Sequence, residues 1–157
     1  MDIGDQTQGR LEVFEANLLV RGSYDQAAQD CSAIIHTASP FTFAFTNPTK
    51  ELLEPAVRGT ENILLAANAS KSVRKVVLTS SVGAIMGDMR DMKRKGLTAF
   101  SESDWNTTSN LTHKPYEFSK TEAEKKAWEM AAQQKQWELA VINPFFVMGP
   151  PLSPHLH

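Results

Sequence analysis

The pattern of apolar and polar residues predicts short strands that alternate with helices. Strands are predicted at residues 11–16, 33–38, 73–80 and 139–142. The first alternates apolar and polar positions, whereas the second is a mostly apolar run that fits a strand buried on both faces. Apolar residues at helical spacing predict a helix over residues 49–69, in which Pro55 marks the first turns or a kink.

Two further helices and the connecting loops complete the predicted order. Pro115 opens a long helix that ends near Gln136, because proline suits a first helical turn. Ser23 and Gln26 form a capping box, which predicts a short helix over residues 23–30. Residues 40–48 and 83–104 are expected to be loops. Strands that alternate with helices indicate βαβ units, so we expect an α/β fold with a parallel sheet.

Ligands on parallel sheets bind beyond the carboxyl ends of the strands. Those ends are Thr37-Ala38, Ser80-Ser81 and Asn143-Pro144. The sequence therefore directs the search for chemistry to three short segments.

Composition narrows the class of protein. The 157 residues, 41% apolar and 22% charged, suit one globular domain with its own core. A net charge of −2 offers no basic surface for nucleic acid or anionic lipid, and no apolar run approaches the ~20 residues of a membrane helix. The single Cys31 and the polar first ten residues favour a cytoplasmic protein. The histidines show no metal-ligand spacing, so no metal is expected.

Tyr116 and Lys120 are the first candidates for chemistry. They lie four residues apart at the start of a predicted helix, so their side chains share one face. Lowering a tyrosine pKa from ~10 to ~7 allows proton exchange at neutral pH and requires about 4 kcal/mol of phenolate stabilisation. A cation ~4 Å away at an effective dielectric of ~20 supplies about that much. The same spacing also fits the start of an ordinary amphipathic helix, so the pair alone leaves both interpretations open.

Ser80 and Ser81 are the second candidates. They follow the best-defined strand, where a hydroxyl can hydrogen-bond a substrate carbonyl and polarise it. Serine is also common in turns that end strands, so a purely structural role is equally compatible with the pair.

The order of these segments resembles the extended short-chain dehydrogenase/reductase family. The likeness is to its dihydroflavonol 4-reductase and cinnamoyl-CoA reductase branch, within the NAD-dependent epimerase/dehydratase superfamily. The matching segments follow one another from Leu11 to Pro151, at residues 22–25, 35–40, 57–60, 73–81, 103–105, 116–128, 142–144 and 149–150.

The resemblance implies an NAD(P)-dependent oxidoreductase that acts on a small carbonyl or alcohol substrate, with NADP as the expected cofactor and NAD as the alternative. Tyr116 would act as the general acid, Lys120 would lower its pKa and bind the nicotinamide ribose, and Ser81 would hold the substrate oxygen. Asn17 stands where the branch usually has an aspartate against adenine, so this contact is expected to be weaker. The residues expected to contact the cofactor are Asn17, Leu18, Thr37, Ala38, Ser39, Ser80, Tyr116, Lys120, Pro144, Phe145 and Val147.

Two parts of the family's fold find no counterpart in the sequence. The first βαβ unit, with its glycine-rich phosphate-binding turn, is not recognisable before Leu11, and the substrate lid is not recognisable after Pro151. We therefore expect residues 1–157 to form a single, partial NAD(P)-binding Rossmann-like domain that binds cofactor weakly and has little or no activity. Without the first strand, the edge beside Ala38 is open, and residues 11–16 are expected to move into that gap or to stay poorly paired.

Two other functions remain open at this point. The chain could be a non-catalytic relative that acts as a pseudoenzyme or binding partner, or an epimerase or dehydratase, because those enzymes share the same triad. The sequence settles neither the substrate nor the oligomeric state.

Overall fold

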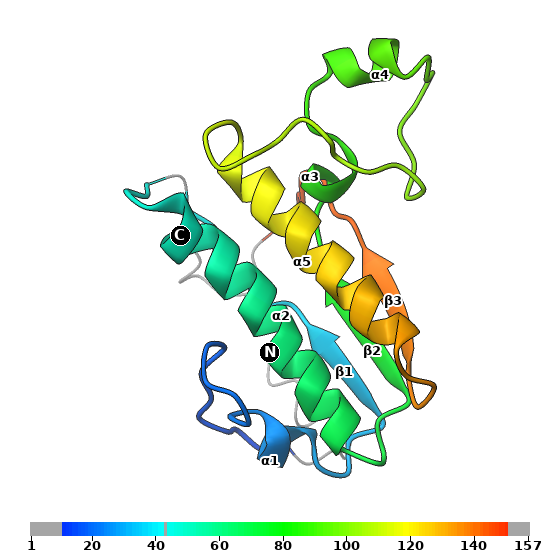
Figure 1. Cartoon of the computed structure of the whole chain (residues 1–157). Coiled ribbons are helices and arrows are strands. Elements are labelled where there is room, and N and C mark those ends of the chain that lie inside the picture. The colour runs from blue at the N-terminus through cyan, green and yellow to red at the C-terminus, as the bar shows by residue number, and fades with distance from the viewer. Residues whose placement is uncertain (1–10, 43, 151–157) are drawn as a thin grey trace.

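The described part of the chain is a three-stranded parallel sheet with two long helices on one face (Figure 1). A computed structural model describes residues 11–42 and 44–150. The strands pair in the order β1, β2, β3, which confirms the predicted α/β class. Their bounds are β1 (Ala33–His36), β2 (Lys75–Thr79) and β3 (Glu138–Ile142).

The long helices are α2 (Glu54–Ala69) and α5 (Pro115–Ala132). A π-helical turn over Thr49–Leu53 leads directly into α2, and Pro55 lies in the first turn of α2. Helix α5 ends before the predicted Gln136, because that glutamine turns away and its Nε2 donates to the carbonyls of Ala67 and Ser70 at the end of α2. Three short helices complete the set: α1 (Asp25–Ala28), α3 (Val82–Ile85) and α4 (Arg90–Arg94).

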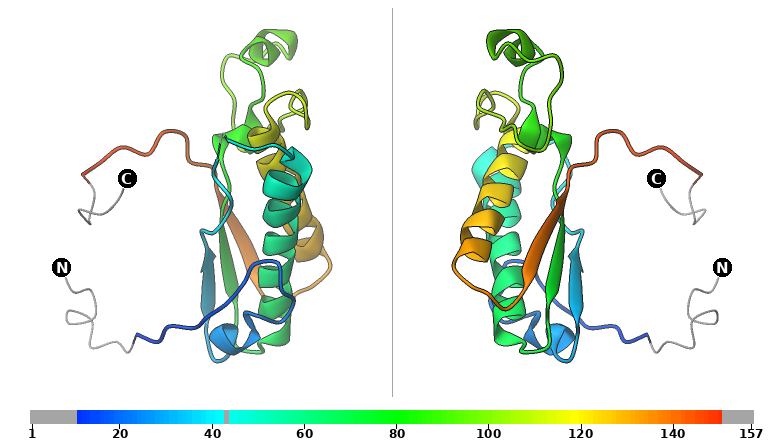
Figure 2. Two further views of the ribbon diagram at one scale, coloured as in Figure 1. Left: turned by 90° about the vertical axis from the view of Figure 1, so that its left-hand side faces the viewer. Right: turned by 90° about the vertical axis from the view of Figure 1, so that its right-hand side faces the viewer.

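The core lies between the sheet and these two helices. Leu64 and Ala67 of α2 and Ala127 of α5 pack against Val76 and Leu78 of β2. The strand residues that alternate with these point to the other face, which carries no helix among the described residues (Figure 2). Ile35 is 71% exposed and Ile142 is 54% exposed on that face. The expectation that residues 33–38 would be buried on both faces is therefore wrong.

The predicted strand at residues 11–16 does not form. No residue of this segment pairs with the sheet, and the side chains of Leu11 and Val13 are 83% and 87% exposed. An alternating pattern is compatible with a half-buried strand. The strand forms only where a neighbouring strand offers its backbone for hydrogen bonding. Of the two expected outcomes for this segment, the poorly paired one is observed.

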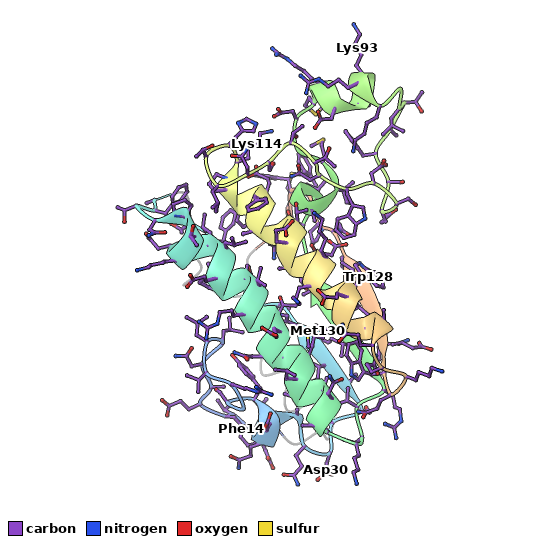
Figure 3. All side chains as sticks on the ribbon, viewed as in Figure 1. Phe14, Asp30, Lys93, Lys114, Trp128 and Met130 are labelled. Atoms are coloured by element: carbon purple, nitrogen blue, oxygen red, sulfur yellow. The ribbon has the colours of Figure 1, made fainter. Side chains whose placement is uncertain are left out.

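Two local predictions also need correction. Helix α1 is shorter than residues 23–30, because Ser23 does not cap it: its Oγ accepts a hydrogen bond from the Asn17 N–H at 2.6 Å. The segment 83–104 is not all loop, since α3 begins within the turn after β2 and α4 follows it. Helices of four or five residues are too short to leave an apolar period in the sequence. Figure 3 shows Lys93 of α4 pointing away from the sheet and its two long helices.

No helix in the described ranges is both long and apolar enough to cross a bilayer.

Replacement of Leu64 by alanine tests the packing of α2 on the sheet. Leu64 is 1% exposed, so Leu64→Ala is expected to lower the free energy of unfolding by about 2–5 kcal/mol in urea denaturation. Leu11→Ala is the matched control, because this leucine is 83% exposed and its loss should change the value by less than about 0.5 kcal/mol. Equal effects at the two sites would contradict the assignment of the core.

His36, at the end of β1, gives the fold a pH dependence. It is 5% exposed, and burial first, then the nearby Lys120 charge, lower its pKa from 6.5 to about 4. Between these values the unfolded chain binds a proton that the folded chain excludes. The free energy of unfolding should therefore fall as pH decreases from about 6.5 to 4, by about 3 kcal/mol for this group.

His36→Gln is the matched variant, because its side chain stays neutral throughout this range. Urea titrations at several pH values should show a shallower slope for the variant than for the parent chain. Parallel slopes would mean that His36 does not carry this dependence.

Candidate functional site

The candidate site lies where β2 and β3 end. Backbone pairing continues beyond the strands: the Ser80 N–H donates to the Ile142 carbonyl at 2.8 Å, and the Val82 N–H donates to the Pro144 carbonyl at 2.9 Å. This extension carries residues 80–82 and 143–144 side by side past the edge of the sheet. Two of the three predicted strand ends are therefore held together by main-chain hydrogen bonds.

Ser81 connects this edge to α5. Its Oγ accepts a hydrogen bond from the Gly83 N–H at 3.1 Å, so the residue caps α3. The same side chain is hydrogen-bonded to the Tyr116 hydroxyl, which brings the two predicted catalytic oxygens together. Ser81 thus has the structural role of a turn residue and also faces the phenol.

Gly83 permits this approach. A Cβ at Gly83 would lie 2.9 Å from Cγ and 3.2 Å from Cα of Glu117, closer than a side chain tolerates. Helix α3 can therefore rest against the first turn of α5, where Tyr116 lies. The Phe41 ring packs edge-on against the Tyr116 ring with centroids 5.2 Å apart.

Lys120 follows Tyr116 by four residues on α5 and lies in the interior. It is 6% exposed, and its Nζ donates to the Thr79 carbonyl at 3.2 Å. Burial lowers the Lys120 pKa, and the negative charge of Glu124 opposes this by raising it. The ammonium is therefore directed toward the end of β2.

The expected lowering of the Tyr116 pKa is not observed. Its pKa is raised above 10.0, because burial of the phenol outweighs the hydrogen bond from Ser81, and the charge of Glu117 raises it further. The i, i+4 spacing placed Lys120 on the right helix face, but its ammonium is hydrogen-bonded to the Thr79 carbonyl. In this structure the phenol is held in its protonated form at neutral pH.

Glu124 and Asn143 belong to the site and were not among the predicted residues. Glu124 is 6% exposed; its Oε2 accepts from Asn143 Nδ2 at 2.8 Å and its Oε1 accepts from Trp128 Nε1 at 3.3 Å. Asn143 Nδ2 also donates to the Ser81 carbonyl at 3.1 Å. These contacts link α5 to the turn that carries Ser81. The sequence could have indicated Glu124, because it follows Lys120 by four residues and so shares the helix face of Tyr116 and Lys120.

Some of the residues predicted to contact the cofactor line one hollow. Asn17, Leu18 and Ala38 line a depression of about 680 Å³ together with Ser23 and Tyr24. The Asn17 Oδ1 accepts from the Leu19 N–H at 2.9 Å, so its carboxamide oxygen is held in place by the chain itself. Asn62 of α2 fixes the next residue by donating to the Leu18 carbonyl at 2.6 Å.

The remaining predicted residues lie at the strand ends but differ in exposure. Thr37 is exposed and Ser39 is half-buried beyond β1, whereas Ser80 is 7% exposed with its hydroxyl turned inward. Beyond β3, Phe145 and Val147 are 78% and 84% exposed, and the Pro144 carbonyl is engaged by Val82. The structure thus brings Ser81 and Tyr116 together and directs Lys120 to the Thr79 carbonyl at the end of β2. It leaves Phe145 and Val147 on the surface.

Proteins of similar sequence are plant reductases. The chain is 38% identical over 156 residues to cinnamoyl-CoA reductase CAD2 of Medicago truncatula, an alignment that covers 98% of this chain and 47% of that protein. It is 35% identical over 150 residues to tetraketide alpha-pyrone reductase 1 of Arabidopsis thaliana, covering 94% of this chain and 44% of that protein. The chain thus spans about half the length of these relatives.

Solved structures agree with the sequence relatives. The yeast methylglyoxal/isovaleraldehyde reductase Gre2, complexed with NADPH, superposes with a TM-score of 0.77 at 32% identity and covers 96% of this chain and 47% of its own. Gre2 of Candida albicans in complex with NADPH gives a TM-score of 0.75 at 35% identity, covering 90% and 44%. This confirms the predicted Rossmann-like arrangement and the reductase resemblance.

The family model described as male sterility protein, an NAD-binding family, matches residues 13–155. That match covers nearly the whole chain, including both strand-end turns and all of α5. The chain belongs to this NAD-binding family.

Proposed function

We propose that this chain carries the catalytic half of an NADP(H)-dependent oxidoreductase that reduces the carbonyl group of a small molecule to an alcohol. The observation that carries the proposal is the hydrogen bond between the hydroxyls of Ser81 and Tyr116 at the edge of a parallel sheet, with Tyr116 on the helix that also carries the buried Lys120. Two hydroxyls directed to one point form a binding site for a carbonyl oxygen.

The relatives support this reaction class. Cinnamoyl-CoA reductase and tetraketide alpha-pyrone reductase are reductases by name, and the yeast and Candida albicans Gre2 structures contain NADPH. The bound nicotinamide cofactor would supply the hydride. The residues of this chain would bind the carbonyl oxygen and deliver a proton to it.

Tyr116 is the proposed proton donor. Its raised pKa keeps the phenol protonated at neutral pH, which is the form that reduction requires. The Ser81 hydroxyl would donate a hydrogen bond to the carbonyl oxygen and hold it beside the phenol. The Lys120 ammonium would donate hydrogen bonds to the ribose hydroxyls of the cofactor. Its burial keeps the ammonium in one orientation.

The proposed cofactor path follows the strand ends. The adenine would occupy the hollow lined by Asn17, Leu18 and Ala38, whose backbone is already fixed by Asn62 and by the Asn17 turn. Thr37, Ser39 and Ser80 would contribute mainly through their backbone. Pro144, Phe145 and Val147 would cover the nicotinamide, and the exposed rings and methyl groups of the last two would be buried by it.

Titration with NADPH tests the cofactor site. Amide NMR shifts are suited to this test, because they detect weak as well as tight binding. The shifts should concentrate on residues 17–18, 37–39, 80–81 and 145–147. Shifts confined to α4 or to the amino-terminal ends of the strands would contradict the proposed position of the cofactor.

Tyr116→Phe tests the catalytic role. Removal of the phenol oxygen should lower kcat for NADPH-dependent carbonyl reduction by about 10²–10⁴-fold. Ser81→Ala should lower it by about 10²–10³-fold. Ser32→Ala, at an exposed serine before β1, is the matched control and should retain full activity. A turnover rate that Tyr116→Phe leaves unchanged would contradict the catalytic role.

A further inference from the structure

A small cavity lies beneath Lys120, between the ends of β1 and β2 and the helices α2 and α5. Its walls include His36, Ser39, Thr60, Ser80, Lys120 and Glu124. The space open to the centre of a water molecule is ≈ 10 Å³. The cavity is separate from the hollow lined by Asn17 and Leu18, although Ala38 borders both.

Two residues that line this cavity carry hydroxyl groups without a hydrogen-bond partner among the described residues. The Oγ atoms of Ser39 and Ser80 are both buried, and no side chain or backbone group of residues 11–42 or 44–150 hydrogen-bonds them. Ser80 is only 7% exposed. A buried hydroxyl without a hydrogen bond is unfavourable, so two of them on one cavity point to a bound molecule that satisfies both.

The size of the cavity and the charge of its walls limit which molecule it can hold. A buried water needs roughly 10–15 Å³ of this kind of space and two to four polar partners. A phosphate or a metabolite is too large, and the Lys120 ammonium on the wall repels a metal cation. The neighbouring His36 is neutral at physiological pH, because burial lowers its pKa to about 4.

We propose that one water molecule is bound in this cavity, where it bridges the hydroxyls of Ser39 and Ser80 and accepts a hydrogen bond from Lys120 Nζ. The ammonium has three protons, and the Thr79 carbonyl accepts one of them at 3.2 Å. The water provides a second acceptor. It ties Lys120 to the ends of β1 and β2 together, whether or not the chain turns over a substrate.

A high-resolution crystal structure of the chain tests this directly. We expect a single density peak within hydrogen-bonding distance of both serine Oγ atoms, which persists in crystals soaked with NADPH and disappears in Ser80→Ala. A cavity closed by rotated side chains would overturn the proposal. So would displacement of the peak by a cofactor hydroxyl, which would assign the two serines to the cofactor instead.

Thermal unfolding gives an independent test, because the two possibilities predict different changes in Tm. If a water satisfies both hydroxyls, Ser39→Ala and Ser80→Ala should each lower Tm, and the double variant should lose less than the sum of the two. If the hydroxyls are truly unbonded, each substitution removes a buried unsatisfied group and should leave Tm unchanged or raise it. The control Ser32→Ala should not shift Tm. Additive losses at the two sites would also contradict a shared water.

Discussion

Main-chain pairing beyond the ends of β2 and β3 is the constraint on which the site depends. The bonds from Ser80 to Ile142 and from Val82 to Pro144 fix the turn after β2 before any side chain contributes. Ser81 lies between these two anchors, so its hydroxyl has little freedom. Helix α3 starts from this fixed point, and the absence of a side chain at Gly83 lets α5 bring Tyr116 to it.

Burial under the two long helices affects the ionisation of three side chains near the end of the sheet. His36, Lys120 and Glu124 are all at most 6% exposed, and each responds differently. The histidine stays neutral, whereas the ammonium and the carboxylate are near enough for the Glu124 charge to raise the Lys120 pKa. Asn143 and Trp128 complete the hydrogen bonding of the carboxylate. Hydrogen bonds to the carboxylate and to the ammonium reduce the free-energy cost of burying these charges.

The sequence predicted the elements whose pattern is long or strongly apolar. Helix α2 has a full apolar face, α5 has a proline at its start, and the Val76–Leu78 centre of β2 is unambiguous. The segment 11–16 was misjudged because strand formation depends on a partner edge that local pattern does not reveal. Spacing brought Tyr116 and Lys120 to one helix face, but the direction of the ammonium depends on the Thr79 carbonyl, 41 residues away in sequence. The sequence placed Asn143 at a strand end but gave no sign of its hydrogen bonds, because its partners, the Ser81 carbonyl and Glu124, come from the turn after β2 and from α5.

The one-sided covering of the sheet has a consequence for handling the protein. Ile35, Val77 and Ile142 form part of a flat apolar face, flanked by the unpaired edge of β1, within the part of the chain that the structure describes. Surfaces of this kind attract hydrophobic dyes, chaperones and other strands. This face, together with the open edge of β1, is therefore where the described part of the chain is expected to associate at high concentration.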